Sequence, residues 1–162
     1  MGGDAGVVAV HLLGVPLRLR ESFNEHTQEL LRELALVQIG AGHEHVGALP
    51  QRLLRLAEDV ETTYASFQER PVAALEAASA AGREFADVTY EVPARAGAFT
   101  RHLLDVLEQA DDFCREQQLL TLPAPPALVA YRRWLLGEFT RQLAGAEPRP
   151  WAGTGATGVA AP

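Results

Sequence analysis

The stretch Ser22–Ile39, SFNEHTQELLRELALVQI, decides the fold of this chain. Its apolar residues recur at the three- and four-residue spacing of one helical face, namely at Phe23, Leu30, Leu34 and Val37. Ser22 and Glu25 match a capping box, in which two residues satisfy free N–H groups at a helix start. Gly40 suits the left-handed position that follows a helix end. The stretch therefore predicts a helix from Ser22 to Ile39, with His26 on its apolar face. The helix could begin as early as Leu17, but the capping box favours Ser22.

Composition and charge exclude several classes of protein. The chain has 162 residues and a net charge of −7, so it lacks the positive surface that nucleic acid or an anionic membrane requires. All 14 basic residues are arginine, which excludes mechanisms that depend on a Schiff-base or phosphate-binding lysine. Cys114 is the single cysteine, so no intrachain disulfide can form. We expect a cytoplasmic protein with no nucleic-acid and no membrane partner.

The rest of the pattern predicts a mostly α-helical fold, a bundle of about five helices. Further helices are expected at about 49–67, 71–82, 94–118 and 126–143. The helix that starts at residue 71 could end at Gly82, or it could continue to Ala86 and bury Phe85. Two other apolar segments, Val7–Val15 and Asp87–Val92, have strand-like patterns and could form one short two-stranded β pairing.

The same pattern predicts one domain with loose ends. Residues 1–6 are expected to be a flexible N-terminus and residues 7–145 a single helical domain. Residues 146–162 have the composition of a disordered Pro/Gly-rich tail. Trp151 is the exception within that tail, because a lone tryptophan often docks back on the fold or binds a partner.

Three polar residues at apolar helix faces form the candidate polar centre: His26, His102 and Glu138. His102 follows Phe99 by three residues and precedes Val106 by four, which places it on the apolar stripe of its helix. If the three side chains meet, the carboxylate would raise the imidazole pKa and create a pH-sensitive or ligand-binding centre. The more ordinary interpretation, which we favour, is that both histidines are hydrogen-bonded core residues.

Metal and covalent chemistry find little support in the sequence. No histidine follows a glutamate by three residues, so the ligand pair of a di-iron bundle is absent. His43 and His45 form a His-x-His in a glycine-rich loop, but a closed zinc site needs four ligands. Cys114 and His102 lie too far apart along one predicted helix to pair within it. We predict no catalytic residue, no metal and no cofactor.

An aromatic and arginine cluster marks the candidate interaction surface. It comprises Tyr131, Arg132, Arg133 and Trp134, together with the acidic outer face of the preceding helix at Asp105, Glu108, Asp111 and Asp112. Tryptophan, tyrosine and arginine are the favoured anchors of protein interfaces. Packing of Trp134 against a neighbouring helix, with its N–H hydrogen-bonded, is an equally good explanation.

Three stretches resemble a family of small helical actinobacterial proteins: HLLGVPLRLRESFNEHTQELLREL, DVTYEVPARAGAF and YRRWLLGEFTRQLAG followed by Trp151. That family is similar to proteins that accompany anti-sigma and anti-anti-sigma partner-switching regulators. The resemblance covers about His11 to Trp151 and implies a regulatory role without supplying catalytic residues. LPAPPALVAYRRWLLGEF also resembles the opening helix of the serine-kinase-type ATPases of those systems. Their asparagine-bearing and Asp-x-Gly-x-Gly boxes have no counterpart here, so ATP binding is not carried over.

The sequence thus predicts a non-enzymatic, cytoplasmic regulatory domain that acts through contact with another protein. The partner could belong to a partner-switching system, or it could be a second copy in a homodimer. The alternative is a small-ligand or metal-binding sensor, or an enzyme of another kind, centred on His26, His102 and Glu138. An exposed Trp134 or Arg133 would support the interaction hypothesis, whereas a cavity among the three polar residues would support the sensor.

Overall fold

The computed structural model describes residues 6–40 and 69–153. In chain order these residues form β1 (Val7–Pro16), α1 (Leu17–Gly40), α3 (Glu69–Ala80), β2 (Phe85–Pro93), α4 (Ala96–Arg115) and α5 (Pro126–Leu143). The mostly helical fold with a two-stranded antiparallel sheet confirms the predicted class. The predicted count of about five helices is slightly too high for these residues, which hold four, and the helix expected at 49–67 lies outside them.

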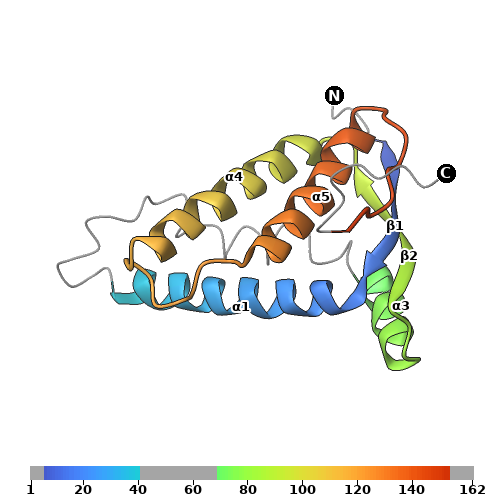
Figure 1. Cartoon of the computed structure of the whole chain (residues 1–162). Helices are drawn as coiled ribbons and strands as arrows, with labels where there is room; N and C mark the ends of the chain where they lie inside the picture. The colour runs from blue at the N-terminus through green and yellow to red at the C-terminus, as the bar shows by residue number, and fades with distance from the viewer. Residues whose placement is uncertain (1–5, 41–68, 154–162) are drawn as a thin grey trace.

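The helices and the sheet occupy different ends of the molecule. Figure 1 shows α1, α4 and α5 running along its length, with β1 and β2 crossing one end and α3 beside the strands. Helix α5 contacts α1, α4 and β1, whereas α3 contacts β2. Helix α1, which follows β1 directly, also contacts it, so α1 and α5 both join the helical part of the molecule to the sheet.

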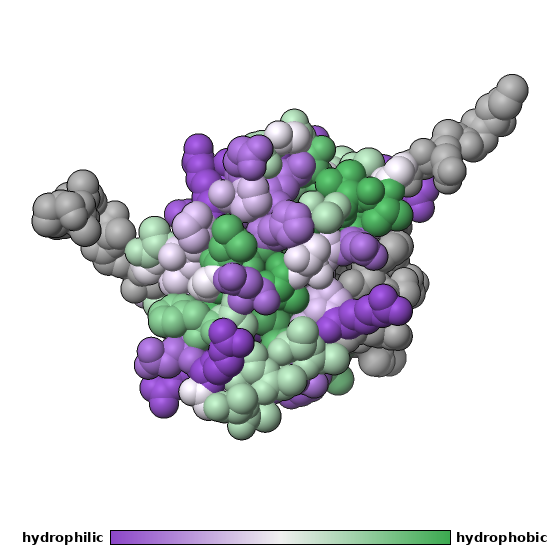
Figure 2. All heavy atoms as spheres, turned by 90° about the vertical axis from the view of Figure 1, so that its right-hand side faces the viewer, coloured by the Kyte–Doolittle hydropathy of each residue, from purple (hydrophilic) through white to green (hydrophobic). Residues whose placement is uncertain are grey.

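The sheet forms because two segments with buried alternate residues pair antiparallel, as predicted. Val10 lies opposite Tyr90 and His11 lies opposite Thr89. Val10 is buried, while His11 and Thr89 are exposed, as expected for a strand with one covered face. The sheet end faces the viewer in Figure 2, where hydrophilic residues separate the hydrophobic ones.

Strand pairing decides two helix ends for which the sequence left alternatives: α1 begins at Leu17 and not at the favoured Ser22, and α3 ends before Gly82, the first of its two predicted ends. Helix α1 begins at Leu17, directly after β1, and the Leu17 N–H donates to the Glu84 carbonyl over 3.0 Å. Ser22 therefore lies inside α1 and does not cap it. Helix α3 ends at Ala80, followed by Gly82 with a φ of +77°. Phe85 consequently starts β2 with half of its side chain exposed, and does not extend the helix.

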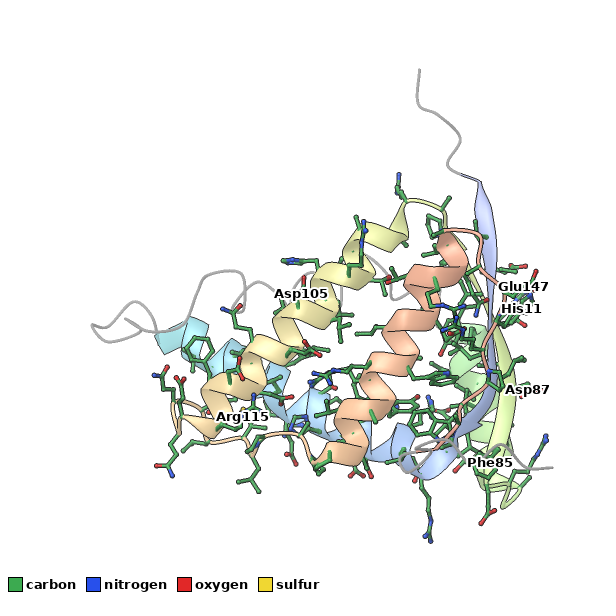
Figure 3. The ribbon with its side chains drawn as sticks, turned by 45° about the horizontal axis from the view of Figure 1, so that its top comes forward. His11, Phe85, Asp87, Asp105, Arg115 and Glu147 are labelled. Carbon is green, nitrogen blue, oxygen red and sulfur yellow. The ribbon has the colours of Figure 1, made fainter. Side chains whose placement is uncertain are left out.

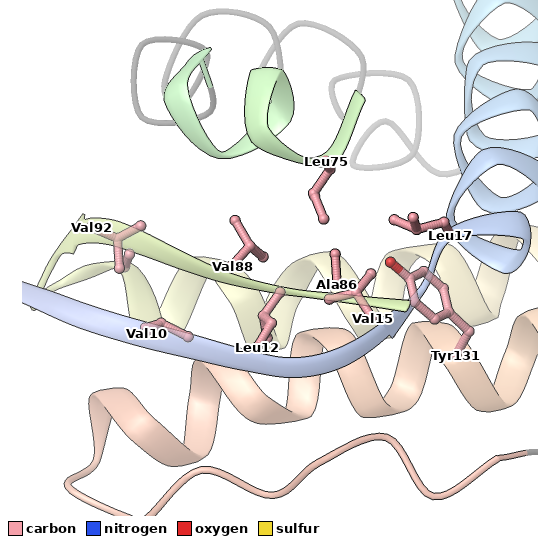
Figure 4. Close-up of a cluster of buried hydrophobic side chains, with 10 residues drawn as sticks. Val10, Leu12, Val15, Leu17, Leu75, Ala86, Val88, Val92 and Tyr131 are labelled. Atoms are coloured by element: carbon pink, nitrogen blue, oxygen red, sulfur yellow. The ribbon is translucent and has the colours of Figure 1, made fainter. Parts of the chain in front are cut away.

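The buried apolar residues form two clusters, one at each end. The sheet cluster, drawn in Figure 4, consists of Val10, Leu12, Val15, Leu17, Leu75, Ala86, Val88, Val92, Ala96 and Tyr131. The helix cluster consists of Leu30, Leu34, Val106, Leu107, Ala110, Cys114, Leu119 and Leu136. Phe23 packs against both, so the helix that the sequence singled out spans the whole core.

The chain after α5 turns back along the sheet. In this C-terminal segment, residues 144–153, the Trp151 N–H donates to the Leu13 carbonyl over 3.0 Å. The Trp151 ring lies 5.5 Å from that of Trp134 and 6.0 Å from that of Tyr131. Trp151 thus docks back on the fold, which corrects the expectation of a disordered tail for residues 146–153, while 154–162 lie outside the described part.

Candidate functional site

The connection between α4 and α5 presents two leucines to solvent. This leucine loop, residues 119–125, begins with Leu119, which is buried in the helix cluster. The next apolar side chains point outward, since Leu120 is 94% exposed and Leu122 is 78% exposed. Pro123 and Pro125 lack the N–H that a helix interior needs, and Pro126 takes the first position of α5, where that N–H is not required. The loop is therefore an irregular segment whose largest free side chains are apolar.

Helix α1 holds the middle of the leucine loop through two polar side chains. The Glu33 carboxylate accepts hydrogen bonds from the Leu120 N–H and from both the N–H and the hydroxyl of Thr121. Burial raises the pKa of Glu33, but these three hydrogen bonds outweigh it and leave the pKa below its usual value. His26 Nε2 donates to the Leu122 carbonyl over 2.7 Å. Figure 1 shows the connection running beside α1.

A buried ion pair holds the end of the loop. Asp111 of α4 and Arg132 of α5 are 1% and 3% exposed, and their charged atoms lie 2.7 Å apart. Asp111 Oδ1 also accepts the Ala124 N–H over 3.1 Å. Within the described part of the chain, neither Asp111 Oδ2 nor Arg132 Nε has a hydrogen bond of good geometry. The pair is thus mainly an electrostatic contact that fixes α4, α5 and the loop together.

Cys114 lies beside this ion pair, and its thiol is unreactive at neutral pH. Burial and the nearby negative charges of Asp111 and Glu33 raise the pKa of the Cys114 thiol to about 11. The residue is buried in the helix cluster. At neutral pH it is a protonated packing residue rather than a nucleophile.

The structure does not bring the predicted polar centre together. His26 is half-buried against the leucine loop, so it is the hydrogen-bonded structural histidine of the ordinary interpretation. His102 is exposed, because the buried side of α4 runs through Thr100 and Leu107 instead. Glu138 is buried but bonds to the C-terminal segment. The three side chains therefore do not share a buried centre, and the favoured interpretation of a hydrogen-bonded core histidine holds for His26 but not for His102, which is exposed.

Glu138 belongs to a second set of polar contacts, at the sheet end. Its carboxylate accepts the Arg149 N–H over 2.9 Å and a Gln142 amide proton over 2.9 Å, and it pairs with Arg141. Gln142 in turn bonds to both backbone groups of His11, donating over 2.7 Å and accepting over 2.8 Å. Gln142 therefore satisfies an open edge of β1, and Glu138 fastens the C-terminal segment to α5. Figure 3 shows His11 and Glu147 at this end.

The aromatic side chains of the predicted interaction surface pack within the fold. Tyr131 and Arg132 are buried. Trp134 is half-buried and donates its indole N–H to the Arg149 carbonyl over 3.0 Å, so the packing explanation holds for it. Arg133 is exposed and bonds to Glu108 of α4 over 2.6 Å.

The acidic part of that surface remains in contact with solvent, with one exception. Asp105 and Asp112 are exposed, and Asp112 pairs with Arg115 at the end of α4. Figure 3 shows Asp105 along α4 and Arg115 where the leucine loop starts. Asp111 is the exception, because its side chain turns into the ion pair with Arg132 and leaves the outer face.

No three histidine, cysteine, aspartate or glutamate residues in the described part gather in a group that could hold a metal, and His43 and His45 lie outside it. No helix within residues 6–40 or 69–153 is both long and apolar enough to cross a membrane. Comparison of the chain with protein-family models, curated proteins and solved structures finds no match.

Sequence reasoning missed the leucine loop, although a signal was present. LLTLPAPP places three leucines in a proline-containing turn, where no helical stripe can bury all of them. The signal shows neither which leucine turns outward nor that Glu33, 87 residues before Leu120, holds the loop.

Proposed function

We propose that this protein is a non-enzymatic interaction domain that binds another protein through its leucine loop. One observation carries the proposal: Leu120 and Leu122 are exposed although the backbone that bears them is held in place. Exposed apolar residues scattered singly need no explanation. Leu120 and Leu122 differ from such scattered residues, because hydrogen bonds hold the backbone of residues 120–122. Their side chains cannot pack onto the protein surface unless those hydrogen bonds break.

The energetics of the loop favour recognition. Full burial of a leucine side chain stabilises a complex by roughly 1.5–3 kcal/mol. A loop already held in its bound shape loses less conformational entropy on binding, so more of that free energy appears as affinity. A buried ion pair contributes little net stability. The Asp111–Arg132 pair is therefore better explained by the loop geometry that it fixes than by the stability that it adds.

Helix α1 extends the apolar surface beyond the loop. Leu36 is 63% exposed and lies one helical turn after Glu33, the residue that grips Leu120. The exposed pair Asp112–Arg115 lies where α4 passes into the loop. This arrangement, apolar anchors beside charged side chains, matches the apolar centre and polar rim of protein interfaces.

The finer proposal concerns the cellular role. The family resemblance supports a cytoplasmic regulator in a bacterial partner-switching system, whose partner would be an anti-sigma or anti-anti-sigma protein or a second copy of the chain. The absence of lysine and the protonated state of Cys114 support a binding role over covalent catalysis. The sensor centre at His26, His102 and Glu138 is not proposed, because those residues have separate surroundings.

Site-specific photocrosslinking tests the proposal. A benzophenone amino acid is placed at Leu120 in one variant and at His102, an exposed residue of α4, in the control. After irradiation in the organism that encodes the chain, the Leu120 variant should give a discrete adduct that the His102 variant lacks. A mass of two chains would identify a homodimer, and any other mass a different partner. No adduct at Leu120, or the same adducts at both positions, would refute the proposal.

A further inference from the structure

A cavity of about 740 Å³ lies between β1, α1, α3, β2, α4 and α5. Its described walls include apolar side chains from three helices: Phe23, Leu31, Leu103, Leu107, Leu135 and Phe139. Pockets for small organic ligands have volumes of about 300–1,000 Å³ and mainly apolar walls with a few polar groups. The cavity matches this description, and neither His26, His102 nor Glu138 is among its described walls.

Among the described residues of the cavity wall, one is basic, and two are tyrosines. Arg20 is half-buried and forms no ion pair or hydrogen bond with any residue in the described part. Tyr90 and Tyr131 also line the cavity, and no hydrogen bond joins either phenol to another described residue. Figure 4 shows the Tyr131 hydroxyl turned toward Leu17 at the start of α1.

Electrostatics indicates that the Arg20 charge acts on both phenols. Burial raises the pKa of Tyr90 and of Tyr131, and the positive charge of Arg20 opposes the rise in each case. Both phenols are therefore protonated hydrogen-bond donors at neutral pH. A guanidinium and two hydroxyl donors thus line the same cavity, and none of the three is hydrogen-bonded to an acceptor in the described part of the chain.

Three carboxylates at the same cavity have a smaller influence. Glu21, Glu25 and Glu76 are exposed, and Glu21 accepts a hydrogen bond from the Ser79 hydroxyl over 2.9 Å. Charges in contact with water are screened by dissolved salt, whereas a half-buried contact is screened less. The Arg20 guanidinium should therefore determine the charge of the ligand. The exposed carboxylates at the rim should repel an anionic ligand weakly, and salt should reduce that repulsion.

We propose that the cavity binds a long-chain carboxylate of the fatty-acid class. The hydrocarbon chain lies among the apolar walls, and the carboxylate accepts hydrogen bonds from Arg20, Tyr90 and Tyr131. A charged hydrogen bond to a guanidinium is stronger than a neutral one, and each buried methylene adds favourable free energy. This binding site is separate from the leucine loop, so it does not depend on the proposed interaction function.

Calorimetric titration of the full chain tests the ligand class. Decanoate, dodecanoate and tetradecanoate, each kept below its micelle concentration, should bind with an affinity that rises up to about fourfold per added methylene. Dodecanol, which has the same chain without the charge, should bind about tenfold or more weakly than dodecanoate. No saturable binding of dodecanoate, or equal binding of dodecanol, would overturn the proposal.

Arginine variants test the position of the carboxylate. R20Q should weaken dodecanoate binding about tenfold or more, while dodecanol binding stays unchanged. R18Q is the matched control, because Arg18 is exposed on the same helix and does not line the cavity. Equal affinities of R20Q and R18Q would refute the assignment. If R20Q does not fold by circular dichroism, Y90F provides the same comparison, with an expected loss of about three- to tenfold.

Discussion

The C-terminal segment and the leucine loop are held by the same means but treat their apolar residues in opposite ways. Each is an irregular stretch whose backbone is bonded by helix side chains, Glu138 at the sheet end and Glu33 at the other end. The C-terminal segment packs Trp151 against two aromatic rings. The leucine loop leaves Leu120 almost wholly exposed.

This difference separates a contact that serves the fold from one that serves recognition. Backbone hydrogen bonds place a segment, and each contributes about 1 kcal/mol of net stability wherever it lies. Burial of a large side chain adds a stabilisation that the isolated protein already realises at Trp151. At Leu120 the same stabilisation is absent from the isolated chain, so it can be gained only when a partner covers the leucine.

Breaking the buried ion pair should cause the largest loss of stability, and it should loosen the leucine loop more than the C-terminal segment. R132A leaves the Asp111 charge buried without its partner, and such changes cost about 3–5 kcal/mol. The free energy of unfolding, measured by urea denaturation, should fall by that amount. The leucine loop should lose protection from amide hydrogen exchange before the C-terminal segment does, because Asp111 also holds Ala124.

Two controls accompany R132A. R133A removes an exposed partner of Glu108 and should change stability by less than about 1 kcal/mol. The double variant D111L/R132M replaces both charges with apolar groups, and stability should recover most of the loss. If R133A proved as damaging as R132A, the buried pair would not be the main tether at this end.

The second prediction compares the loss of stability when Trp151 is removed with the loss when Leu120 and Leu122 are replaced. W151A removes a half-buried ring from the sheet cluster and should cost about 2 kcal/mol, less than the roughly 3–5 kcal/mol of a fully buried tryptophan. The double variant L120S/L122S should stay within about 0.5 kcal/mol of the parent, as exposed substitutions usually do. Similar losses in the two variants would mean that the leucines already pack in the isolated chain.

The fold could be predicted from the sequence wherever one strong periodicity determined the structure. The helix over Ser22–Ile39 exists, and the two strand-like segments pair as expected. The favoured helix start at Ser22 was wrong, because a contact distant in sequence overrode the local capping signal. The Leu17 N–H at the start of α1 donates to the Glu84 carbonyl, and a local capping pattern contains no information about that hydrogen bond.

The candidate site was much less predictable, since it depends on the rotation of helices and on irregular segments. Spacing placed His102 on a stripe with Phe99, but the packing of α4 turned it to solvent. His26 was rightly singled out, whereas its partner proved to be a backbone carbonyl in the leucine loop rather than a carboxylate. A hydrogen bond from a side chain to a loop backbone does not depend on the side chains of the loop, so the spacing of residue types does not predict it.

The third prediction uses pH to test the loop tether separately. The pKa of Glu33 in the folded protein lies below its unfolded value, so its stabilisation is present above about pH 4.5 and disappears as the pH falls through the folded pKa. E33Q should therefore be less stable than the parent by about 1 kcal/mol near neutral pH, and the gap should close as the pH falls through the folded pKa of Glu33. E29Q, at an exposed position of α1, is the control and should show no comparable gap.

The smallest expected effect concerns α5, one of the two helices that join the two ends. Gly137 lies inside α5, between Arg132 and Glu138, and a Cβ atom there would meet no atom of the described residues within 4 Å. G137A should therefore raise the free energy of unfolding by about 0.5–1 kcal/mol, through the better helix propensity of alanine. This corresponds to a rise in Tm of about 2–3 °C for a chain of this size. Because neither tethered segment contacts this position, hydrogen exchange in both should slow equally, and a change at only one end would show that α5 transmits strain between them.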